Sequence, residues 1–312
     1  MFYRFIKCFD KQISISNSVF SGQSFMWNKL TTDSDYFYSL INNTVVFIKH
    51  ISENTIEVYS SDNTIDGLVI TDYITRYFTL DVDHDTCFPH DFQDYYPEVW
   101  RLIQPYLSTK ILRQDPFSTM ITFMCAQGIG MQLIRRQVEL IAKNYGEEIT
   151  VAFSGKQITL HRFPDPITLA RADPEELRYC TNNNRVRAAN IVLASKAVAE
   201  GRVDLAGLTD RTIPLALLQE TLSGIQGIGY KIADCIALFG LGRFDAFPVD
   251  THVRQYLATW FNMPQASREL SPRNYLLLQR GAQSIFNPDL AGYAGHILFH
   301  CWRKEARGMI RF

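Results

Sequence analysis

The sequence lacks the features that mark membrane, secreted and fibrous proteins. It has no apolar run long enough to cross a membrane, no secretory signal, no internal repeat and no low-complexity tract. Its six cysteines are scattered, and no Cys-x-x-Cys pair occurs among Cys8, Cys87, Cys125, Cys180, Cys235 and Cys301. We therefore expect a reduced, intracellular protein without a membrane partner, in the cytoplasm or nucleoid if the source is bacterial.

Net charge is also nearly absent, but the charges are unevenly distributed. The formal net charge of the 312 residues is −1. Residues 1–100 contain 6 Lys/Arg and 14 Asp/Glu, whereas residues 101–312 contain 25 Lys/Arg and 18 Asp/Glu. The second part of the chain is therefore basic, which permits contacts with nucleic-acid phosphates there.

The residue pattern changes near residue 108. Residues 1–70 alternate and are rich in β-branched and aromatic residues, as in Thr44–Ile51 and Thr55–Tyr59, which is typical of antiparallel strands. Later segments have helical spacing, namely 117–128, 131–145, 174–180 and 186–199. We expect an α+β protein, with an N-terminal antiparallel β-sheet domain (1–107) followed by a mostly α-helical domain (108–312).

A helical hairpin is predicted at about residues 213–240. Two apolar helical patterns, Pro214–Leu222 and Tyr230–Phe239, flank the turn Ser-Gly-Ile-Gln-Gly-Ile-Gly. Gly227 and Gly229 allow another backbone to approach closely, and the N–H groups that open the second helix favour an anion. The turn can therefore hold a DNA phosphate, although an ordinary hairpin with a Gly-rich loop gives the same pattern.

Two residues in or after this hairpin are candidates for catalysis. Lys231 lies in the first turn of the second helix, where the helix dipole opposes a positive charge and so favours the neutral amine that a nucleophile needs. Asp250 precedes a helical pattern over Thr251–Phe261 and is predicted to be its N-cap. A carboxylate fixed in this way can stabilise positive charge on a sugar. A phosphate-contacting lysine and a purely structural cap are the alternatives.

These residues resemble a known motif. The segments Gly227-Ile-Gly-Tyr-Lys231-Ile-Ala-Asp-Cys235 and Pro248-Val-Asp250-Thr-His252 are similar to those of the helix-hairpin-helix DNA glycosylases, and among them of the 8-oxoguanine DNA glycosylase/lyases. Further segments of the same family occur in family order, so that the resemblance covers nearly the whole chain. They are Ser21–Phe25, Tyr77–Val82, Leu112–Pro116, Arg187–Val198 and Ala291–Phe299.

The resemblance implies a bifunctional enzyme of base excision repair that excises 8-oxoguanine and then cleaves the strand. Lys231 would form the Schiff base, and Asp250 would support glycosidic cleavage. The base pocket would be formed by Gly22, whose carbonyl accepts the N7 hydrogen of the lesion, by Cys235 and Phe299 on the two faces of the base, by His252 near a phosphate, and by Gly295.

The chain departs from the family at positions that read bases. Gly295 stands where eukaryotic members have a glutamine, and Gln127-Gly128-Ile129 stands where the family has a run of asparagines. Leu133 aligns with an arginine that contacts the opposite cytosine, whereas Arg187 matches a second such arginine. We therefore expect Gln127, Gly128 and Arg187 to lie at the DNA, with weaker discrimination of the opposite base.

The expected partner is duplex DNA that contains an oxidised purine, bound by a monomer. No cofactor or metal is expected in catalysis, and a structural cation at the hairpin is compatible with the motif. An iron–sulfur cluster is not expected, because related branches hold one with four closely spaced cysteines, and only Cys301 lies in that region. Two alternatives remain: a monofunctional glycosylase for alkylated bases, which lacks the lysine, and a non-catalytic hairpin protein that only binds DNA.

Overall fold

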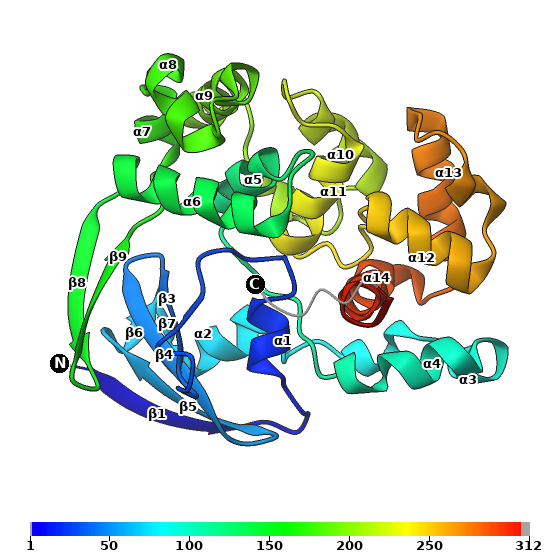
Figure 1. Ribbon diagram of the computed structural model, residues 1–312, viewed down its shortest axis with the longest axis horizontal. Coiled ribbons are helices and arrows are strands. Elements are labelled where there is room, and N and C mark those ends of the chain that lie inside the picture. Colours follow the sequence, from blue (N-terminus) through cyan, green and yellow to red (C-terminus); the bar gives the residue numbers. More distant parts are fainter. Residues whose placement is uncertain (1, 307–312) are drawn as a thin grey trace.

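The computed structural model describes residues 2–306. Its N-terminal part is a five-stranded antiparallel sheet with the strand order β1-β5-β4-β3-β2 (Figure 1). The strands are β1 (Tyr3–Cys8), β2 (Asn28–Lys29), β3 (Phe37–Ile41), β4 (Thr44–Ser52) and β5 (Thr55–Ser60). This sheet, followed by a helical region, confirms the expected α+β class.

Each face of the sheet is covered differently. One face packs on α1 (Ile15–Val19) and α2 (Ile70–Tyr77) around the buried Trp27, whose indole N–H donates to the Tyr77 hydroxyl at 2.9 Å. A small hairpin of β6 (Thr64–Ile65) and β7 (Leu68–Val69) leads into α2. The other face contains Phe47, which stacks on Phe153 with ring centroids 3.8 Å apart.

Phe153 belongs to a second hairpin, which lies within the part of the chain expected to be mostly helical. Its strands are β8 (Glu148–Phe153) and β9 (Lys156–His161), and Figure 1 shows it reaching from the helices down to the sheet. It follows α6 (Met131–Tyr145) in the chain and packs on the sheet through Phe153, so that it connects the helical part to the sheet.

The remaining chain is helical. Several helices begin at a side-chain N-cap followed by proline, as at Asp115 and Asp165, because proline fits the first helical position. The helices are α3 (Phe92–Tyr95), α4 (Pro97–Ile103), α5 (Pro116–Cys125), α6 (Met131–Tyr145), α7 (Pro166–Ala170), α8 (Pro174–Leu177), α9 (Arg185–Ala199), α10 (Leu215–Ser223), α11 (Tyr230–Phe239), α12 (Thr251–Phe261), α13 (Pro272–Gln283) and α14 (Ala291–Cys301).

The hydrophobic cores show which segments pack together. The last residues in the chain that belong to the core of the sheet are Phe78 and Leu112. Cys87, Phe92 and Ile103 belong to the core of the helical part, although they precede residue 108, where the helical domain was expected to begin. Phe25, from the loop between α1 and β2, also belongs to the helical core. This loop brings Gly22 from the N-terminal part to the helices.

Candidate active site

The predicted hairpin consists of α10 and α11 joined by residues 224–229. Ile225 and Ile228 are buried and anchor the turn. Gly227 has a φ of +88°, and a Cβ atom there would lie 2.6 Å from the Asn190 amide nitrogen. Glycine is therefore required at this position for two reasons. Gly229 is the N-cap of α11 and is exposed, and the first N–H groups of the helix have no partner within the helix.

Lys231 lies in the first turn of α11 and is half-buried. Its Nζ atom lies 5.3 Å from the centroid of the Phe123 ring, at the wall of an apolar cavity. Cys235 lies one turn further along the same face. Burial raises the pKa of the Cys235 thiol to about 12, although the nearby Lys231 acts in the opposite direction. Cys235 is therefore a neutral apolar group of the wall rather than a nucleophile.

Asp250 is the N-cap of α12. Its Oδ1 atom accepts a hydrogen bond from the backbone N–H of Val253 at 2.8 Å. This bond uses one carboxylate oxygen and fixes the direction of the other.

One cavity of about 160 Å³ brings these groups together. Its lining includes every residue predicted for catalysis and for the base pocket: Lys231, Asp250, Gly22, Cys235, Phe299, Gly295 and His252. They come from the α1–β2 loop and from α11, α12 and α14, which are far apart in the sequence. The sequence could predict the members because each lies in a recognisable motif.

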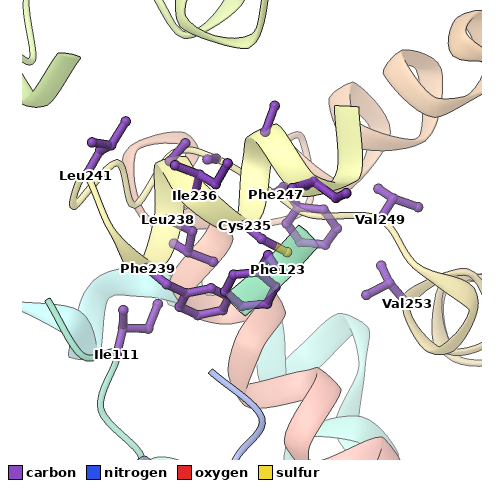
Figure 2. Close-up of a cluster of buried hydrophobic side chains, with 14 of the residues drawn as sticks. Ile111, Phe123, Cys235, Ile236, Leu238, Phe239, Leu241, Phe247, Val249 and Val253 are labelled. Atoms are coloured by element: carbon purple, nitrogen blue, oxygen red, sulfur yellow. The ribbon is translucent and has the colours of Figure 1, made fainter. Parts of the chain in front are cut away.

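The walls of the cavity are aromatic. Figure 2 shows the rings of Phe123 and Phe239 beside each other below α11, with the sulfur of Cys235 close to Phe123 and Phe247. The Phe123 and Phe239 rings are stacked with centroids 5.4 Å apart. Such walls suit the flat, apolar faces of a nucleobase.

Phe247 explains the glycine at position 295. A Cβ atom on Gly295 would lie 2.4 Å from Cε2 of the Phe247 ring. The Phe247 ring therefore fills the space beside position 295 of α14. Eukaryotic members of the family that the chain resembles carry a glutamine at this position.

Gly22 has a φ of +92°, which side-chain-bearing residues rarely adopt, and a Cβ atom there would lie 2.5 Å from the end of Met131. The Sδ atom of Met131 also accepts a hydrogen bond from Nη1 of the buried Arg303 at 3.2 Å. The Arg303 guanidinium lies 5.4 Å from the centroid of the Phe299 ring. Burial lowers its pKa to about 10, against the effect of Asp250, so it stays charged at neutral pH.

Met131, Arg303, Phe247 and His296 are lining residues that the sequence analysis did not identify. Burial lowers the pKa of His296 to about 3, and its Nε2 atom lies 2.8 Å from the Ser21 hydroxyl, so the ring is neutral. Only Arg303 could have been anticipated, because it follows Phe299 by four residues and thus shares its helical face.

The residues predicted at the opposite base lie outside the cavity. Arg187 is buried, and its Nη2 atom donates to the Gln127 carbonyl at 2.6 Å. The Gln127 amide in turn donates to the Gly227 carbonyl at 2.8 Å. Gly128 and Leu133 are exposed. Arg187 thus holds loop 126–130, and this loop is linked to the turn of the hairpin.

Residues 2–306 contain neither a cluster of metal-ligating side chains nor a membrane-spanning helix. No group of three or more His, Cys, Asp or Glu side chains there could hold a metal ion. The helices of this part of the chain are all too short or too polar to cross a membrane.

Comparisons with known proteins point to the family that the motifs resemble. Residues 5–120 match the family model of the 8-oxoguanine DNA glycosylase N-terminal domain. The N-glycosylase/DNA lyase OGG1 of Arabidopsis thaliana is 28% identical over 213 residues, which cover 67% of this chain and 56% of that protein. The N-glycosylase/DNA lyase of Saccharomyces cerevisiae is 25% identical over 261 residues, which cover 78% of this chain and 66% of the yeast protein. The chain thus spans less than two thirds of the length of either.

Solved structures share the fold over nearly the whole chain. MBOgg1 in complex with a low-affinity DNA ligand has a TM-score of 0.79 at 25% identity and covers 98% of this chain and 99% of its own. Clostridium acetobutylicum 8-oxoguanine glycosylase/lyase with DNA that has cytosine opposite 8-oxoguanine has a TM-score of 0.77 at 20% identity, over 97% and 98% of the two chains. The 3-methyladenine DNA glycosylase of Archaeoglobus fulgidus has a TM-score of 0.72 at 18% identity, over 97% and 99%, so the fold alone does not select the substrate. Residues 5–120 thus match the N-terminal domain of the 8-oxoguanine DNA glycosylases, and the chain as a whole is similar to proteins of that family in its motif residues and in its fold.

Proposed function

We propose that the protein is a bifunctional DNA glycosylase/AP lyase that excises 8-oxoguanine from duplex DNA. The observation that carries the proposal is that Lys231 and Asp250 line the same aromatic cavity, and the N–H groups that open α11 beside it suit a phosphate. The names of the curated relatives and the matched N-terminal domain support the substrate.

In the proposed first step, the damaged base leaves the DNA stack and enters the cavity, which costs a few kcal/mol. The neutral Lys231 amine attacks C1′, and the bond from C1′ to the base breaks as the base departs with its electron pair. Asp250 stabilises the positive charge that develops on the sugar. Cys235 and Phe299 would cover the two faces of the base, and the Gly22 carbonyl would accept its N7 hydrogen.

In the second step, loss of the amine proton and opening of the sugar ring give an imine between Lys231 and C1′. Removal of a proton from C2′ then expels the 3′ phosphate by β-elimination and cuts the strand. These steps need no cofactor. The DNA would be bound by a monomer inside the cell, with backbone N–H groups near Gly227 and Gly229 on a phosphate and His252 near the flipped nucleotide.

The alternatives differ in the chemistry of the cavity. A monofunctional glycosylase for alkylated bases would share the fold, the hairpin and the aspartate, but it has no use for Lys231. A protein that only binds DNA would need neither Asp250 nor an aromatic cavity, so these residues favour the bifunctional enzyme.

A lesion panel tests the proposal. Duplexes that each carry one lesion, either 8-oxoguanine, an alkylated purine or an abasic site, are incubated with the protein, and base release and strand cleavage are measured separately. We expect release of 8-oxoguanine together with cleavage. Release of alkylated bases without cleavage would support the monofunctional alternative, and binding without release would support the third.

A further inference from the structure

Three side chains of α13 hold the segment that leads to Asp250. They are spaced four residues apart on the helix, and they bond to alternate residues of the segment in the opposite order. The Tyr275 hydroxyl accepts from the Val249 N–H at 3.2 Å, the Gln279 amide donates to the Phe247 carbonyl at 3.4 Å, and the Gln283 amide donates to the Asp245 carbonyl at 2.9 Å. We call Tyr275, Gln279 and Gln283 the α13 ladder.

The spacing of the ladder has a simple geometric basis. Four residues of an α-helix rise by about 6 Å, and two residues of chain can span up to about 7 Å. The rungs therefore stay in register along both partners. A segment held at three successive points cannot slide along α13, and Asp250 follows directly after the last rung.

A buried carboxylate connects the ladder to the helix that carries Lys231. Asp234 lies on α11, three residues after Lys231, and its side chain is fully buried. It accepts hydrogen bonds from the Tyr275 hydroxyl at 2.5 Å and from the Gln279 amide at 2.8 Å. Gln219 on α10 donates a third at 2.7 Å. Asp234 thus fixes two rungs relative to α11.

We propose that Asp234 and the α13 ladder are positioning elements that set Asp250 against Lys231. None of them lines the cavity, so they act through the backbone of residues 245–249 and not on the substrate. A displacement of about 1 Å in a reacting group can slow an enzyme roughly 100-fold, so small changes in this segment have large effects. The inference rests on the proposed function, because it assigns these residues to that reaction.

The test uses two tyrosines with matched environments. Tyr275→Phe removes the rung at Val249 and retains the ring, which stacks on Tyr230. Tyr293→Phe is the control, because the Tyr293 hydroxyl is also buried and accepts a backbone N–H, from Ile111 at 3.1 Å, outside the cavity lining. Both variants are assayed for urea midpoint, for affinity to an 8-oxoguanine:cytosine duplex and for single-turnover excision.

We expect both variants to lose stability, and Tyr275→Phe to lose more, since its hydroxyl also donates to the Asp234 carboxyl group. Only Tyr275→Phe should slow excision, by about tenfold, with unchanged affinity for the duplex. Gln283→Leu should have a smaller effect, because its rung is the farthest from Asp250. A wild-type excision rate in Tyr275→Phe, or an equal loss in Tyr293→Phe, overturns the proposal.

Amide hydrogen exchange distinguishes this proposal from the proposed function. Tyr275→Phe should raise the exchange rate of the Val249 amide, whose hydrogen bond it removes, and Tyr293→Phe should not. This measurement holds even if the wild-type protein excises no base, which would disprove the proposed function alone. Unchanged exchange in Tyr275→Phe shows that the rung does not hold the segment and overturns the ladder.

Discussion

The two sides of the cavity differ in how their polar groups are held. On the side of α11 and α12, Asp250 is fixed by its bond to Val253, and the preceding segment is fixed by the α13 ladder and Asp234. On the side of loop 126–130, Gln127 and Gly128 are exposed, and one side-chain bond joins Gln127 to the hairpin turn.

The side of the cavity whose polar groups are held more firmly is also the side that keeps the family motifs. Lys231 and Asp250 keep the family motif, and the segment that leads to Asp250 is held by a network of buried bonds, where a change leaves polar groups unsatisfied. Among the residues predicted at the opposite base, Gln127 and Gly128 are exposed, where substitution is structurally cheap, whereas Arg187 is buried. Substitutions at the exposed positions should therefore leave the catalytic side of the cavity intact.

Lys231→Gln should have the largest effect on the buried side. Borohydride should trap a covalent adduct between the wild-type protein and an 8-oxoguanine duplex, because it reduces the imine. The variant should give no adduct and retain most of its DNA affinity, since glutamine fills a similar volume. Gel separation of the adduct is the measurement. An undiminished adduct in the variant would assign the nucleophile to another amine.

Asp250→Asn separates charge from capping. Asparagine is an equally good N-cap, so the free energy of unfolding should change by well under ~1 kcal/mol. Excision should slow by roughly 100-fold or more, because an electrostatic stabiliser of the transition state is lost. Single-turnover excision and urea unfolding measure the two effects. An excision rate equal to that of the wild type would reduce Asp250 to a cap.

Asp234→Asn tests the buried network through the pH dependence of stability. Burial raises the pKa of the Asp234 carboxyl to about 7, and the nearby Asp245 adds to this, against the hydrogen bonds from Tyr275, Gln219 and Gln279. The unfolded chain has a carboxyl pKa near 3.9, so the folded state binds this proton more tightly. The stability that it contributes is complete below about pH 4 and is lost as the pH rises through about 7.

The Asp234→Asn variant has no carboxyl group at position 234 that could titrate. The stability advantage of the wild type over Asp234→Asn should therefore decrease between pH 4.5 and pH 8, by at most about 4 kcal/mol, and stay constant at higher pH. Urea unfolding of both proteins across this range is the measurement. Parallel stability curves would show that Asp234 titrates in the folded protein as it does in the unfolded chain.

The sequence predicted those parts of the molecule that depend on local patterns. The hairpin expected at about 213–240 is confirmed as part of the fold, with α10 at Leu215–Ser223 and α11 at Tyr230–Phe239, because the apolar spacing and the glycines are local features. The β8–β9 hairpin has alternating residues around Ser154-Gly155, which is a local strand signal within a mostly helical part of the chain.

The parts that the sequence did not predict depend on tertiary contacts. Phe247 against Gly295 and Arg303 beside Met131 join residues that are 48 and 172 positions apart. The α13 ladder joins a helix to an irregular segment, and no periodicity in either reveals the partner. The roles of Gln127, Gly128 and Arg187 at DNA stay predictions.

The smallest effect is expected on the exposed side, in discrimination of the opposite base. Extrusion of the lesion leaves its partner base unpaired, and a preference for cytosine requires hydrogen bonds to it. Leu133 cannot donate one, and Arg187 is occupied with the Gln127 carbonyl. Each missing base contact reduces discrimination by about 1–3 kcal/mol. Single-turnover excision of 8-oxoguanine opposite each of the four bases should therefore show a preference for cytosine over adenine below about a thousandfold.

Leu133→Arg sharpens this test, because Leu133 is 38% exposed on α6 and an arginine fits there without overpacking. The added donor should raise the cytosine preference by roughly 5- to 150-fold, the equivalent of one base contact. Leu277→Arg on α13 is the control, since Leu277 is 42% exposed and the substitution adds the same charge elsewhere. A gain in both variants would reflect net charge instead of base reading, and a thousandfold cytosine preference in the wild type would show that residues other than Leu133 and Arg187 read the opposite base.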